Sequence, residues 1–381
     1  METIYFNVPP FTGNELKYVE EAINSHHICG DNQFCKKCSE WLENDTGAAR
    51  VLLTTSGSHA LDMAAQLCDL KPGDEVILPS YTFSSTANAF ALVGATLVFV
   101  DILPNTMNID PDAIERAITD KTKVICAVHY AGVGCDMERI CKIANDHNLI
   151  LVEDAAHAVL ADYNDKRLGT YGRFGCYSFH ETKNYSMGEG GAILLNNPAD
   201  IEKAEILREK GTDRSRFLLG LVDKYTWRDK GSSYVPSDMN AAYLWAQLQM
   251  AHEINNDRLR SWGLYYELLT PLLEEGYLEL PYIPNNSKHN AHMFYIKVDN
   301  IDVRTKLSAY LSENGIKTAF HYVPLHSAPA GLKYGRFDGE DKVTTKESER
   351  LLRLPMYYGL KEEDVKRVCE GIKAFFKEEN K

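Results

Sequence analysis

The central part of the chain alternates between short hydrophobic runs rich in β-branched residues and amphipathic runs of helical period. The predicted strands are residues 51–53, 75–78, 96–100, 123–128, 149–153, 174–179 and 192–195. The predicted helices between them are residues 58–70, 111–119 and 137–147. Because strands that alternate with helices form βαβ units, we predict an α/β fold with a seven-stranded, mainly parallel sheet.

The rest of the chain has a different pattern. After Pro198 it becomes mainly helical, and residues 239–254, rich in Ala, Leu, Trp and Gln, are expected to form one long helix. Later segments are predicted as one strand and two helices, at residues 291–296, 302–314 and 361–377. We therefore expect a large domain of residues 1–255, which includes the N-terminal segment, and a smaller α+β domain of residues 256–381.

The composition is that of an ordinary soluble globular protein. Hydrophobic residues make up 44% and charged residues 25%, and no stretch approaches the ~20 apolar residues that span a membrane. The first residues lack the basic and apolar regions of a secretory signal, so we expect a cytoplasmic protein. The formal charge of −13 argues against nucleic-acid binding, which needs clustered Lys and Arg.

The nine cysteines indicate reduced thiols rather than disulfides. Their number is odd, and several, such as Cys68 and Cys126, lie in apolar segments. Cys35 and Cys38 form a CxxC pair, but no second Cys or His pair stands at the spacing of a zinc site. We therefore expect no metal site.

Three segments with candidate chemistry follow predicted strands, where an open α/β sheet binds its ligands. The first is residues 54–60 (TTSGSHA), in which a strand gives way to a helix through Ser and Gly. Its backbone N–H groups, hydroxyls and helix N-terminus suit a phosphate. An ordinary serine cap with a glycine turn is the alternative interpretation.

The second segment, residues 153–157 (EDAAH), is an apolar strand that ends in two acids. A carboxylate there suits a metal ion, a ribose hydroxyl or a protonated ring nitrogen. The small residues after Asp154 suit a flat ligand lying against the backbone. His157 is either a ring contact or a histidine at a helix start, and a solvated strand end is the alternative for the acids.

The third segment, residues 178–191 (SFHETKNYSMGEGG), places Lys183 between a strand and a glycine-rich turn. A lysine in that position is a candidate nucleophile for an aldehyde, because a buried site lowers its pKa. A surface lysine is the alternative.

One ligand meets all three requirements. Pyridoxal 5′-phosphate (PLP) has a phosphate, a basic ring nitrogen and an aldehyde. Asp154 would keep the ring nitrogen protonated, and Lys183 would hold the cofactor as a Schiff base and then move the substrate proton. The three segments together therefore predict a PLP-dependent enzyme.

Four motifs occur in an order that resembles the DegT family of nucleotide-sugar aminotransferases. They are residues 56–60 (SGSHA), 79–83 (PSYTF), 153–157 and 178–191, and the later runs 321–326 (HYVPLH) and 354–358 (LPMYY) are similar to family landmarks. The likeness covers nearly the whole chain and implies the type I fold of PLP-dependent transferases. It also implies a homodimer with active sites at the subunit interface.

Position by position, the resemblance makes Lys183 the Schiff-base lysine and Asp154 the partner of the pyridine nitrogen. Phe83 matches an aromatic residue stacked on the ring, although a place in the core explains it equally. The remaining implied contacts are Gly57, Ser58 and Ser178 at the cofactor phosphate and His157 beside the ring.

The chain departs from the family pattern in residues 231–238 (GSSYVPSD). Family members usually carry an Asn-Tyr-Arg run there, and its Asn reaches the cofactor phosphate of the other subunit. Ser233 takes the Asn position. A serine hydroxyl still donates a hydrogen bond but is shorter, which puts this cross-subunit contact in doubt.

Three longer runs, residues 180–185, 222–229 and 344–355, narrow the expected substrates. They resemble family members that move an amino group from L-glutamate to C4 of dTDP-4-dehydro-6-deoxy-D-glucose for surface-polysaccharide synthesis. We expect that reaction, with another keto nucleotide sugar as the alternative. By the same likeness residues 30–33 and 321–326 line the sugar site, with His326 as a substrate contact, although structural turns explain both segments as well.

Other functions fit these residues less well. Sugar 3-dehydratases of this type replace the Schiff-base lysine with histidine, whereas Lys183 is present here. A nicotinamide oxidoreductase would need a G-x-G-x-x-G after a first strand, which is missing. A catalytically silent regulator with this fold would be expected to lose Lys183 or Asp154. A 3-amino sugar product stays open, since no residue dictates how the sugar docks.

Overall fold

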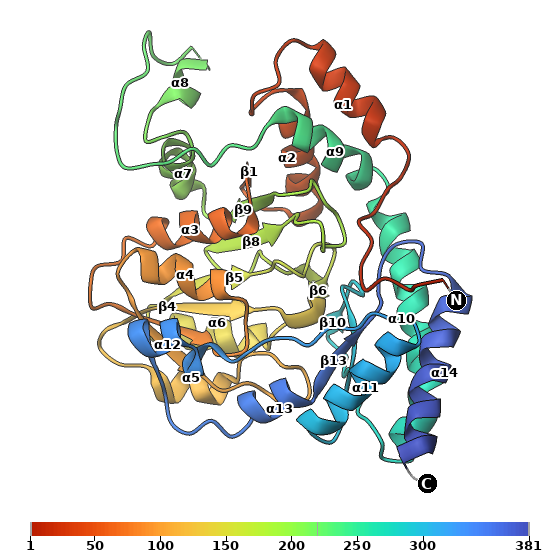
Figure 1. Cartoon of the computed structure of the whole chain (residues 1–381). Coiled ribbons are helices and arrows are strands. Elements are labelled where there is room, and N and C mark those ends of the chain that lie inside the picture. Colours follow the sequence, from red (N-terminus) through yellow and green to blue (C-terminus); the bar gives the residue numbers. More distant parts are fainter. Residues whose placement is uncertain (1, 219, 380–381) are drawn as a thin grey trace.

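The computed structural model describes residues 2–218 and 220–379, which form a central sheet with helices on both faces and a smaller group of helices and strands beside it (Figure 1). The longer helices, of nine residues or more, are α1 (Glu15–Asn24), α2 (Gln33–Thr46), α3 (Gly57–Leu67), α4 (Ser84–Leu92), α6 (Met137–Asp146), α9 (Asp238–Leu248), α10 (Ala251–Glu274), α11 (Ile301–Glu313) and α14 (Glu362–Glu379). The shorter helices are α5 (Pro111–Ala117), α7 (Ile201–Arg208), α8 (Arg214–Leu218), α12 (Pro329–Tyr334) and α13 (Thr344–Arg350). The strands are β1 (Arg50–Thr54), β2 (Glu75–Pro79), β3 (Thr96–Val100), β4 (Thr122–Val128), β5 (Ile150–Asp154), β6 (Asp162–Tyr163), β7 (Lys166–Arg167), β8 (Phe174–Ser178), β9 (Gly191–Leu195), β10 (Ser287–Lys288), β11 (Phe294–Lys297), β12 (Gly335–Phe337) and β13 (Leu351–Leu354).

The central sheet has eight strands in the order β1-β9-β8-β5-β4-β2-β3-β12. β9 is antiparallel to β1 and β8, and the pairs from β8 to β12 are parallel. The predicted mainly parallel α/β sheet is confirmed, and all seven predicted strands are present. The predicted number of strands is too small by one, because β12 comes from the distant C-terminal part and pairs with β3 at the sheet edge.

The sheet separates two hydrophobic layers, because successive side chains of a strand point to opposite faces. On β9, Ala192 and Leu194 belong to the layer that α2, α5, α6 and α9 cover. Ile193 and Leu195 belong to the layer that α3, α4 and α7 cover. Burial on both faces explains why the strands have continuous hydrophobic sequences.

The prediction of one helix at residues 239–254 is wrong. α9 ends at Leu248 and α10 begins at Ala251, and Met250 between them has φ −110° and ψ 17°, outside the helical region. α10 begins in the same hydrophobic cluster as α9, through Ala251 and Ile254, and then extends into the cluster of the C-terminal part, where Tyr265 packs. The break therefore lies where the chain starts to pass from one core to the other, and no Gly or Pro marks it.

The C-terminal part has a hydrophobic cluster of its own, in which α10, α11 and α14 pack on the antiparallel pair of β11 and β13 (Figure 1). The predicted strand and two helices of this part correspond to β11, α11 and α14. Ile4 from the N-terminal segment also belongs to the cluster and forms a bridge with Ile316. The domain boundary between residues 255 and 256 stays a prediction.

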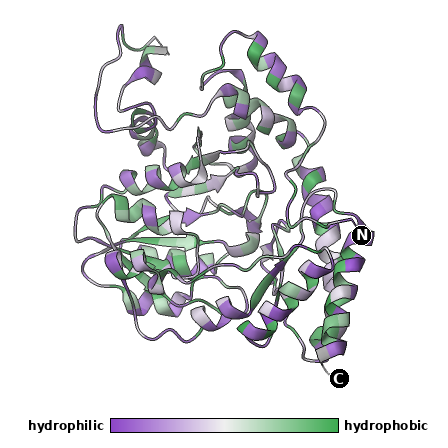
Figure 2. Cartoon of the chain, in the orientation of Figure 1, coloured by the Kyte–Doolittle hydropathy of each residue, from purple (hydrophilic) through white to green (hydrophobic). Residues whose placement is uncertain are grey.

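Apolar side chains are exposed on α1, the first helix of the chain. Hydrophobic and hydrophilic residues alternate along α1 and along α14 (Figure 2). On α1, Leu16 is 73% exposed and Ile23 is 51% exposed. Within residues 2–218 and 220–379, no helix combines the length and the apolar character that crossing a membrane requires.

Candidate active site

A cavity of about 560 Å³ lies where β5 and β8 end and α3 begins. Carboxyl ends of neighbouring parallel strands are the usual ligand site of an open α/β sheet. The predicted site residues that line it are Gly57, Ser58, Phe83, Asp154, His157, Ser178 and Lys183. The structure thus brings together residues that the sequence separates by more than a hundred positions.

The start of α3 faces the end of β8 at very close range. The hydroxyl of Ser56 caps the helix by accepting the His59 N–H at 3.0 Å. A Cβ atom on Gly57 would lie 2.8 Å from Ser178 Cβ, so only glycine fits here. Ser58 Oγ lies 2.6 Å from the hydroxyl oxygen of Ser85, at the start of α4. Backbone N–H groups and several hydroxyls therefore lie close together between the start of α3 and the end of β8. Such hydrogen-bond donors suit a phosphate group.

Hydrogen bonds hold the carboxylate of Asp154 in the cavity. The residue is buried at the end of β5. Its Oδ2 accepts a hydrogen bond of 2.6 Å from Thr86 Oγ1, and its Oδ1 accepts the Ala156 N–H at 3.1 Å. The Thr86 hydroxyl also lies 2.8 Å from Thr82 Oγ1. These contacts leave the carboxylate in the cavity with a defined orientation.

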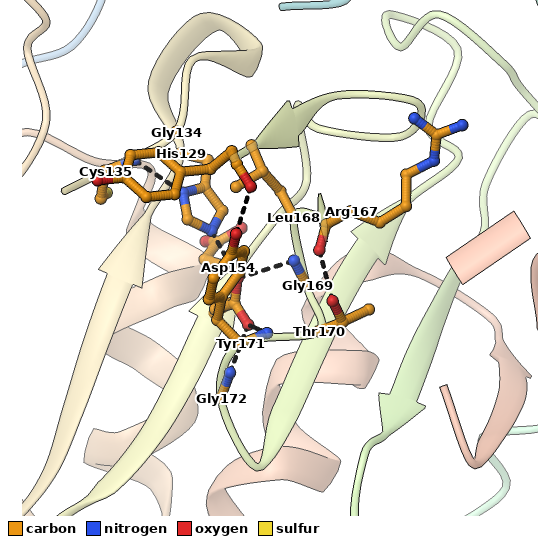
Figure 3. A network of polar contacts seen from close by, with 12 residues as sticks. His129, Gly134, Cys135, Asp154, Arg167, Leu168, Gly169, Thr170, Tyr171 and Gly172 are labelled. Atoms are coloured by element: carbon orange, nitrogen blue, oxygen red, sulfur yellow. Dashed lines mark hydrogen bonds and ion pairs between the residues drawn. The ribbon is translucent and has the colours of Figure 1, made fainter. Parts of the chain in front are cut away.

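The neighbouring acid, Glu153, has a different environment, and its partners His129, Gly169, Tyr171 and Gly172 are labelled in Figure 3. Its side chain is fully buried, and its oxygens accept the N–H groups of Gly169 at 2.8 Å, Tyr171 at 2.6 Å and Gly172 at 2.6 Å. His129 Nε2 is a fourth contact at 2.9 Å. Because all these partners belong to the fold, Glu153 serves to hold the loop after β7, and Asp154 alone of the two acids faces the cavity.

Lys183 lines the cavity without a side-chain partner. Within the described part of the chain, its ammonium group makes no hydrogen bond or ion pair; its backbone N–H closes a turn with the His180 carbonyl oxygen at 2.9 Å. Desolvation in the cavity lowers the pKa of Lys183 to about 8, although the Asp154 carboxylate raises it and the Arg353 guanidinium lowers it further. A lysine with an unengaged, easily deprotonated amine is suited to nucleophilic chemistry.

Neutral histidines form one wall of the cavity. The rings of His157 and His292 stack with centroids 4.2 Å apart. His157 Nδ1 accepts the Ala131 N–H at 3.3 Å. Desolvation, together with the positive charge of Lys183, holds the pKa of His157 well below its usual range. This wall is therefore uncharged, and the ring of His157 offers a flat surface beside Lys183.

Phe83 lies at the rim, and its side chain is 58% exposed. Its ring centroid is 6.1 Å from that of Tyr322. This position outside the core agrees with the predicted contact to a ligand rather than with the alternative of a core residue. Tyr322 and His321, in the run that the family likeness placed at the sugar site, also line the cavity.

Two predicted site residues lie away from the cavity. Ser233 is exposed, in a bridge with Glu209. His326 is engaged inside the fold: its Nδ1 lies 2.6 Å from Ser80 Oγ, and its Nε2 lies 3.3 Å from an oxygen of Asp341. Neither side chain reaches the site within this chain.

The segment at residues 30–33 also does not line this cavity. A Cβ on Gly30 would lie 2.3 Å from the Pro236 carbonyl oxygen, and Asp31 pairs with Arg208 at 2.6 Å. Its turn therefore packs against the stretch before α9.

Residues that sequence analysis missed complete the site. Thr86 and Arg353 are the clearest, because the first fixes Asp154 and the second adds a positive charge to the wall. Thr86 lies three positions after the PSYTF motif, which is the signal that would have found it. Arg353 lies within the last of the three longer runs but reaches the cavity only through long-range packing.

Comparisons with known proteins identify the family to which this chain belongs. The model of the DegT/DnrJ/EryC1/StrS aminotransferase family matches residues 11–373. The chain belongs to this family. A pleiotropic regulatory protein of Geobacillus stearothermophilus is 35% identical, with 95% of this chain and 94% of that protein aligned. GDP-perosamine synthase of Caulobacter vibrioides is 32% identical over 96% of each chain.

A solved structure shows the same fold. The crystal structure of an aminotransferase, TlmJ from Streptoalloteichus hindustanus, superposes with a TM-score of 0.91 at 26% identity, and covers 99% of this chain and 100% of that one. The predicted type I fold of PLP-dependent transferases is confirmed. Family membership makes the protein a PLP-dependent aminotransferase, as the three sequence segments predict.

Three features of the site fit that cofactor. Lys183 has no side-chain partner among the described residues, and the missing side chain of Gly57 lets the start of α3 approach Ser178 more closely than a Cβ would allow. Asp154, with a fixed carboxylate, stands in the same cavity. The retained lysine and carboxylate are those that a catalytically silent relative would be expected to lose.

Proposed function

We propose that the protein transfers an amino group from L-glutamate to C4 of dTDP-4-dehydro-6-deoxy-D-glucose. The products are dTDP-4-amino-4,6-dideoxy-D-galactose and 2-oxoglutarate, and the amino sugar serves surface-polysaccharide synthesis. The observation that carries the proposal is the convergence of Lys183, Asp154 and the Gly57–Ser58 turn on one cavity. The likeness of residues 222–229 and 344–355 favours this sugar, and the name of the Caulobacter relative supports a nucleotide-sugar substrate.

The roles of the residues follow from their places in the cavity. PLP, when bound, supplies an aldehyde that links to an amine and a ring that withdraws electrons. Lys183 would hold the cofactor through Nζ and afterwards carry the proton that the substrate loses. Asp154, held by Thr86, would keep a proton on the ring nitrogen. The groups that would hold the phosphate are Gly57, Ser58 and Ser178, and those that would flank the ring are Phe83 and His157.

We further propose that the protein works as a homodimer in the cytoplasm. The exposed apolar side chains of Leu16, Ile23 and Trp227, the last 78% exposed, suit an interface between subunits. Ser233 lies outside this chain's own cavity, as a contact to the partner's cofactor would require. The free cysteines suit a reducing compartment. Light scattering should give twice the chain mass of 43.0 kDa; the monomer mass would contradict the dimer.

Product analysis tests the substrate assignment. Purified protein with PLP, L-glutamate and dTDP-4-dehydro-6-deoxy-D-glucose should form 2-oxoglutarate and an amino sugar with nitrogen at C4, both identified by NMR. The matched 3-dehydro sugar should react much more slowly. Amination at C3, or reaction only with another keto nucleotide sugar, would keep the aminotransferase and overturn the proposed substrate.

A further inference from the structure

The residue that follows Lys183 is anchored to the C-terminal part of the chain. Asn184 lies in the loop between β8 and β9 and is buried, with 3% of its surface exposed. Its Nδ2 donates a hydrogen bond of 2.9 Å to the Asn290 carbonyl oxygen, and its Oδ1 lies 2.9 Å from His292 Nδ1. Both partners lie just before β11. One side chain therefore joins the loop of Lys183 to a segment more than a hundred positions away.

These contacts fix the proton of His292. Because the amide nitrogen of Asn184 donates to a carbonyl oxygen, the Asn184 Oδ1 faces His292 and accepts, and Nδ1 of His292 donates. Desolvation, and after it the neighbouring His157, holds the pKa of His292 well below its usual range. His292 is therefore neutral with its proton on Nδ1. The hydrogen bond to Asn184 thus persists over the pH range in which Lys183 titrates.

The turn at residues 290–292 also holds His157 in the wall of the cavity. Asn290 Nδ2 donates to the carbonyl oxygens of His157 and Val159, each at 2.8 Å. Asn290 Oδ1 accepts the His292 N–H at 3.1 Å. Ala291, in the middle of the turn, is fully buried and has φ 48°, in the left-handed region that a residue with a Cβ adopts at a cost. Such a conformation persists only where the surrounding contacts impose it, and it is typical of functional sites.

A buried arginine of α10 fixes the same turn from another side. Arg258 is 2% exposed; its Nε donates to the Ala291 carbonyl oxygen at 3.1 Å and its Nη2 to the His292 carbonyl oxygen at 2.6 Å. Desolvation lowers the pKa of Arg258 to about 10, so the guanidinium is still charged at neutral pH. A buried polar network whose members are paired is rigid. The turn therefore offers Asn184 a fixed point of attachment.

A second, small cavity shows what the anchor does for the lysine. Its volume is about 10 Å³, and Lys183, Asn184, Asn290 and His292 are among the residues that line it. This is about the space of one water molecule. Removal of the Asn184 side chain would enlarge the space beside Lys183 and admit water. Since desolvation is the main cause of the low pKa of Lys183, the Asn184 side chain protects the reactive state of the amine.

We propose that Asn184 is a positioning residue for Lys183, an inference that rests on the proposed function for the role of Lys183 as the reacting amine. Among the described residues that line the larger cavity, Lys183 is present and Asn184 is not, so Asn184 acts without touching the substrates. It ties the main chain next to Lys183 to the turn at residues 290–292, which also holds His157. The amine and the flat ring beside it thereby keep one relative position.

Chemical labelling of the apo-protein tests the anchor without turnover. Wild type, Asn184→Ala and Asn196→Ala are treated with a trace of acetic anhydride at a series of pH values, and acetylation of Lys183 is measured by mass spectrometry of its peptide. Only the neutral amine reacts, so the inflection of the rate reports the pKa of Lys183. Asn196→Ala is the matched control, because Asn196 Nδ2 also donates to two carbonyl oxygens, of Gly169 at 3.0 Å and Gly172 at 2.8 Å, outside both cavities.

The wild-type inflection should lie near pH 8. In Asn184→Ala we expect it about one pH unit higher, so that the neutral fraction of Lys183 at pH 7 falls about tenfold, because the released amine becomes better solvated. Asp154 and Arg353, the charges that act on Lys183, are the same in both proteins and do not account for such a shift. Asn196→Ala should lose stability in urea but keep the wild-type inflection. An unchanged or lower inflection in Asn184→Ala would overturn the proposal.

Kinetics of the holoenzyme gives an independent readout. In Asn184→Ala, kcat should fall about tenfold while KM for L-glutamate changes by no more than about threefold, since no substrate contact is lost. A higher KM with an unchanged kcat would contradict the positioning role. If Asn184→Ala fails to fold, Asn184→Ser carries both tests, because its hydroxyl is too short to reach both partners. A wild type whose Lys183 is labelled as expected but which takes up no PLP would refute the proposed function and leave the anchor intact.

Discussion

Thr86 Oγ1 donates a hydrogen bond of 2.6 Å to Asp154 Oδ2, and both side chains are buried. The contact joins the first turn of α4 to the end of β5 and fixes the carboxylate in the cavity. Thr86 therefore orients a residue of the proposed cofactor site and takes no part in the reaction itself.

Replacing Thr86 with valine removes the hydroxyl and keeps the side-chain volume. We expect kcat to fall about tenfold, because a hydrogen bond to a charged group contributes about 1.5–3 kcal/mol. Steady-state kinetics with L-glutamate measures this effect. Thr305→Val, on the exposed face of α11, should leave kcat unchanged. An unchanged kcat in Thr86→Val would show that Asp154 does not need this orientation.

Substitutions of the adjacent acids Glu153 and Asp154 should affect different properties, stability in the first case and activity in the second. In Glu153→Gln an amide –NH₂ would oppose backbone N–H donors or His129, so we expect a loss of about 1–3 kcal/mol in the free energy of unfolding. Asp154→Asn should unfold like the wild type but lose about 100-fold or more in kcat. Urea unfolding and kinetics on both variants check the pair. Loss of stability in Asp154→Asn with full activity would reverse the assignment.

Several features of the fold were predictable because they depend on local sequence. The hydrophobic runs of the seven strands and the spacing of the helices are local patterns that burial on both sheet faces imposes. β12 was missed because it is three residues long and forms only by pairing Gly335–Phe337 with β3 far away in the sequence. The helix break at residue 250 was missed because no Gly or Pro marks it and because it precedes a helix that runs from the core of α9 into the C-terminal cluster.

Lys183, Asp154 and Gly57 could be predicted as site residues because each has a residue type suited to the chemistry and also lies in a recognisable motif. Thr86 and Arg353 were missed because a hydroxyl or a guanidinium has no characteristic sequence pattern; only the folded chain puts them beside Asp154 and Phe6. His326 was placed at the substrate by likeness, but local packing engages both its ring nitrogens.

The close approach of Gly57 to Ser178 should matter for cofactor binding. In Gly57→Ala the new Cβ would meet Ser178 Cβ at 2.8 Å and force α3 and β8 apart. We expect the dissociation constant of PLP to rise about tenfold or more, since overpacking costs about 1–3 kcal/mol. Fluorescence titration of apo-protein with PLP measures it.

The matched control is Gly263→Ala, in α10, where no atom lies within 4 Å of the added Cβ. It should bind PLP normally and unfold with equal or slightly greater free energy, by up to about 1 kcal/mol. Normal PLP affinity in Gly57→Ala would exclude the turn at residues 57–58 from the phosphate site.

The pKa of Lys183 predicts how cofactor uptake depends on pH. Because desolvation lowers this pKa from 10.5 to about 8, the neutral, reactive amine accumulates as the pH rises through 8. The rate at which apo-protein takes up PLP should rise with an inflection near pH 8. Asp154→Asn should move the inflection lower, since that carboxylate raises the pKa, and Arg353→Gln should move it higher. Stopped-flow absorbance measures the rate; an inflection near 10.5 would show an ordinary solvated lysine.

The visible absorbance of the purified protein with PLP, compared with that of Lys183→Ala, is the decisive observation. The wild type should show the band of lysine-linked cofactor, lose it on addition of L-glutamate and regain it with dTDP-4-dehydro-6-deoxy-D-glucose, while Lys183→Ala never forms it. A wild type without the band, or a Lys183→Ala variant that shows it and responds like the wild type, would contradict the assignment of Lys183 and with it the proposed site.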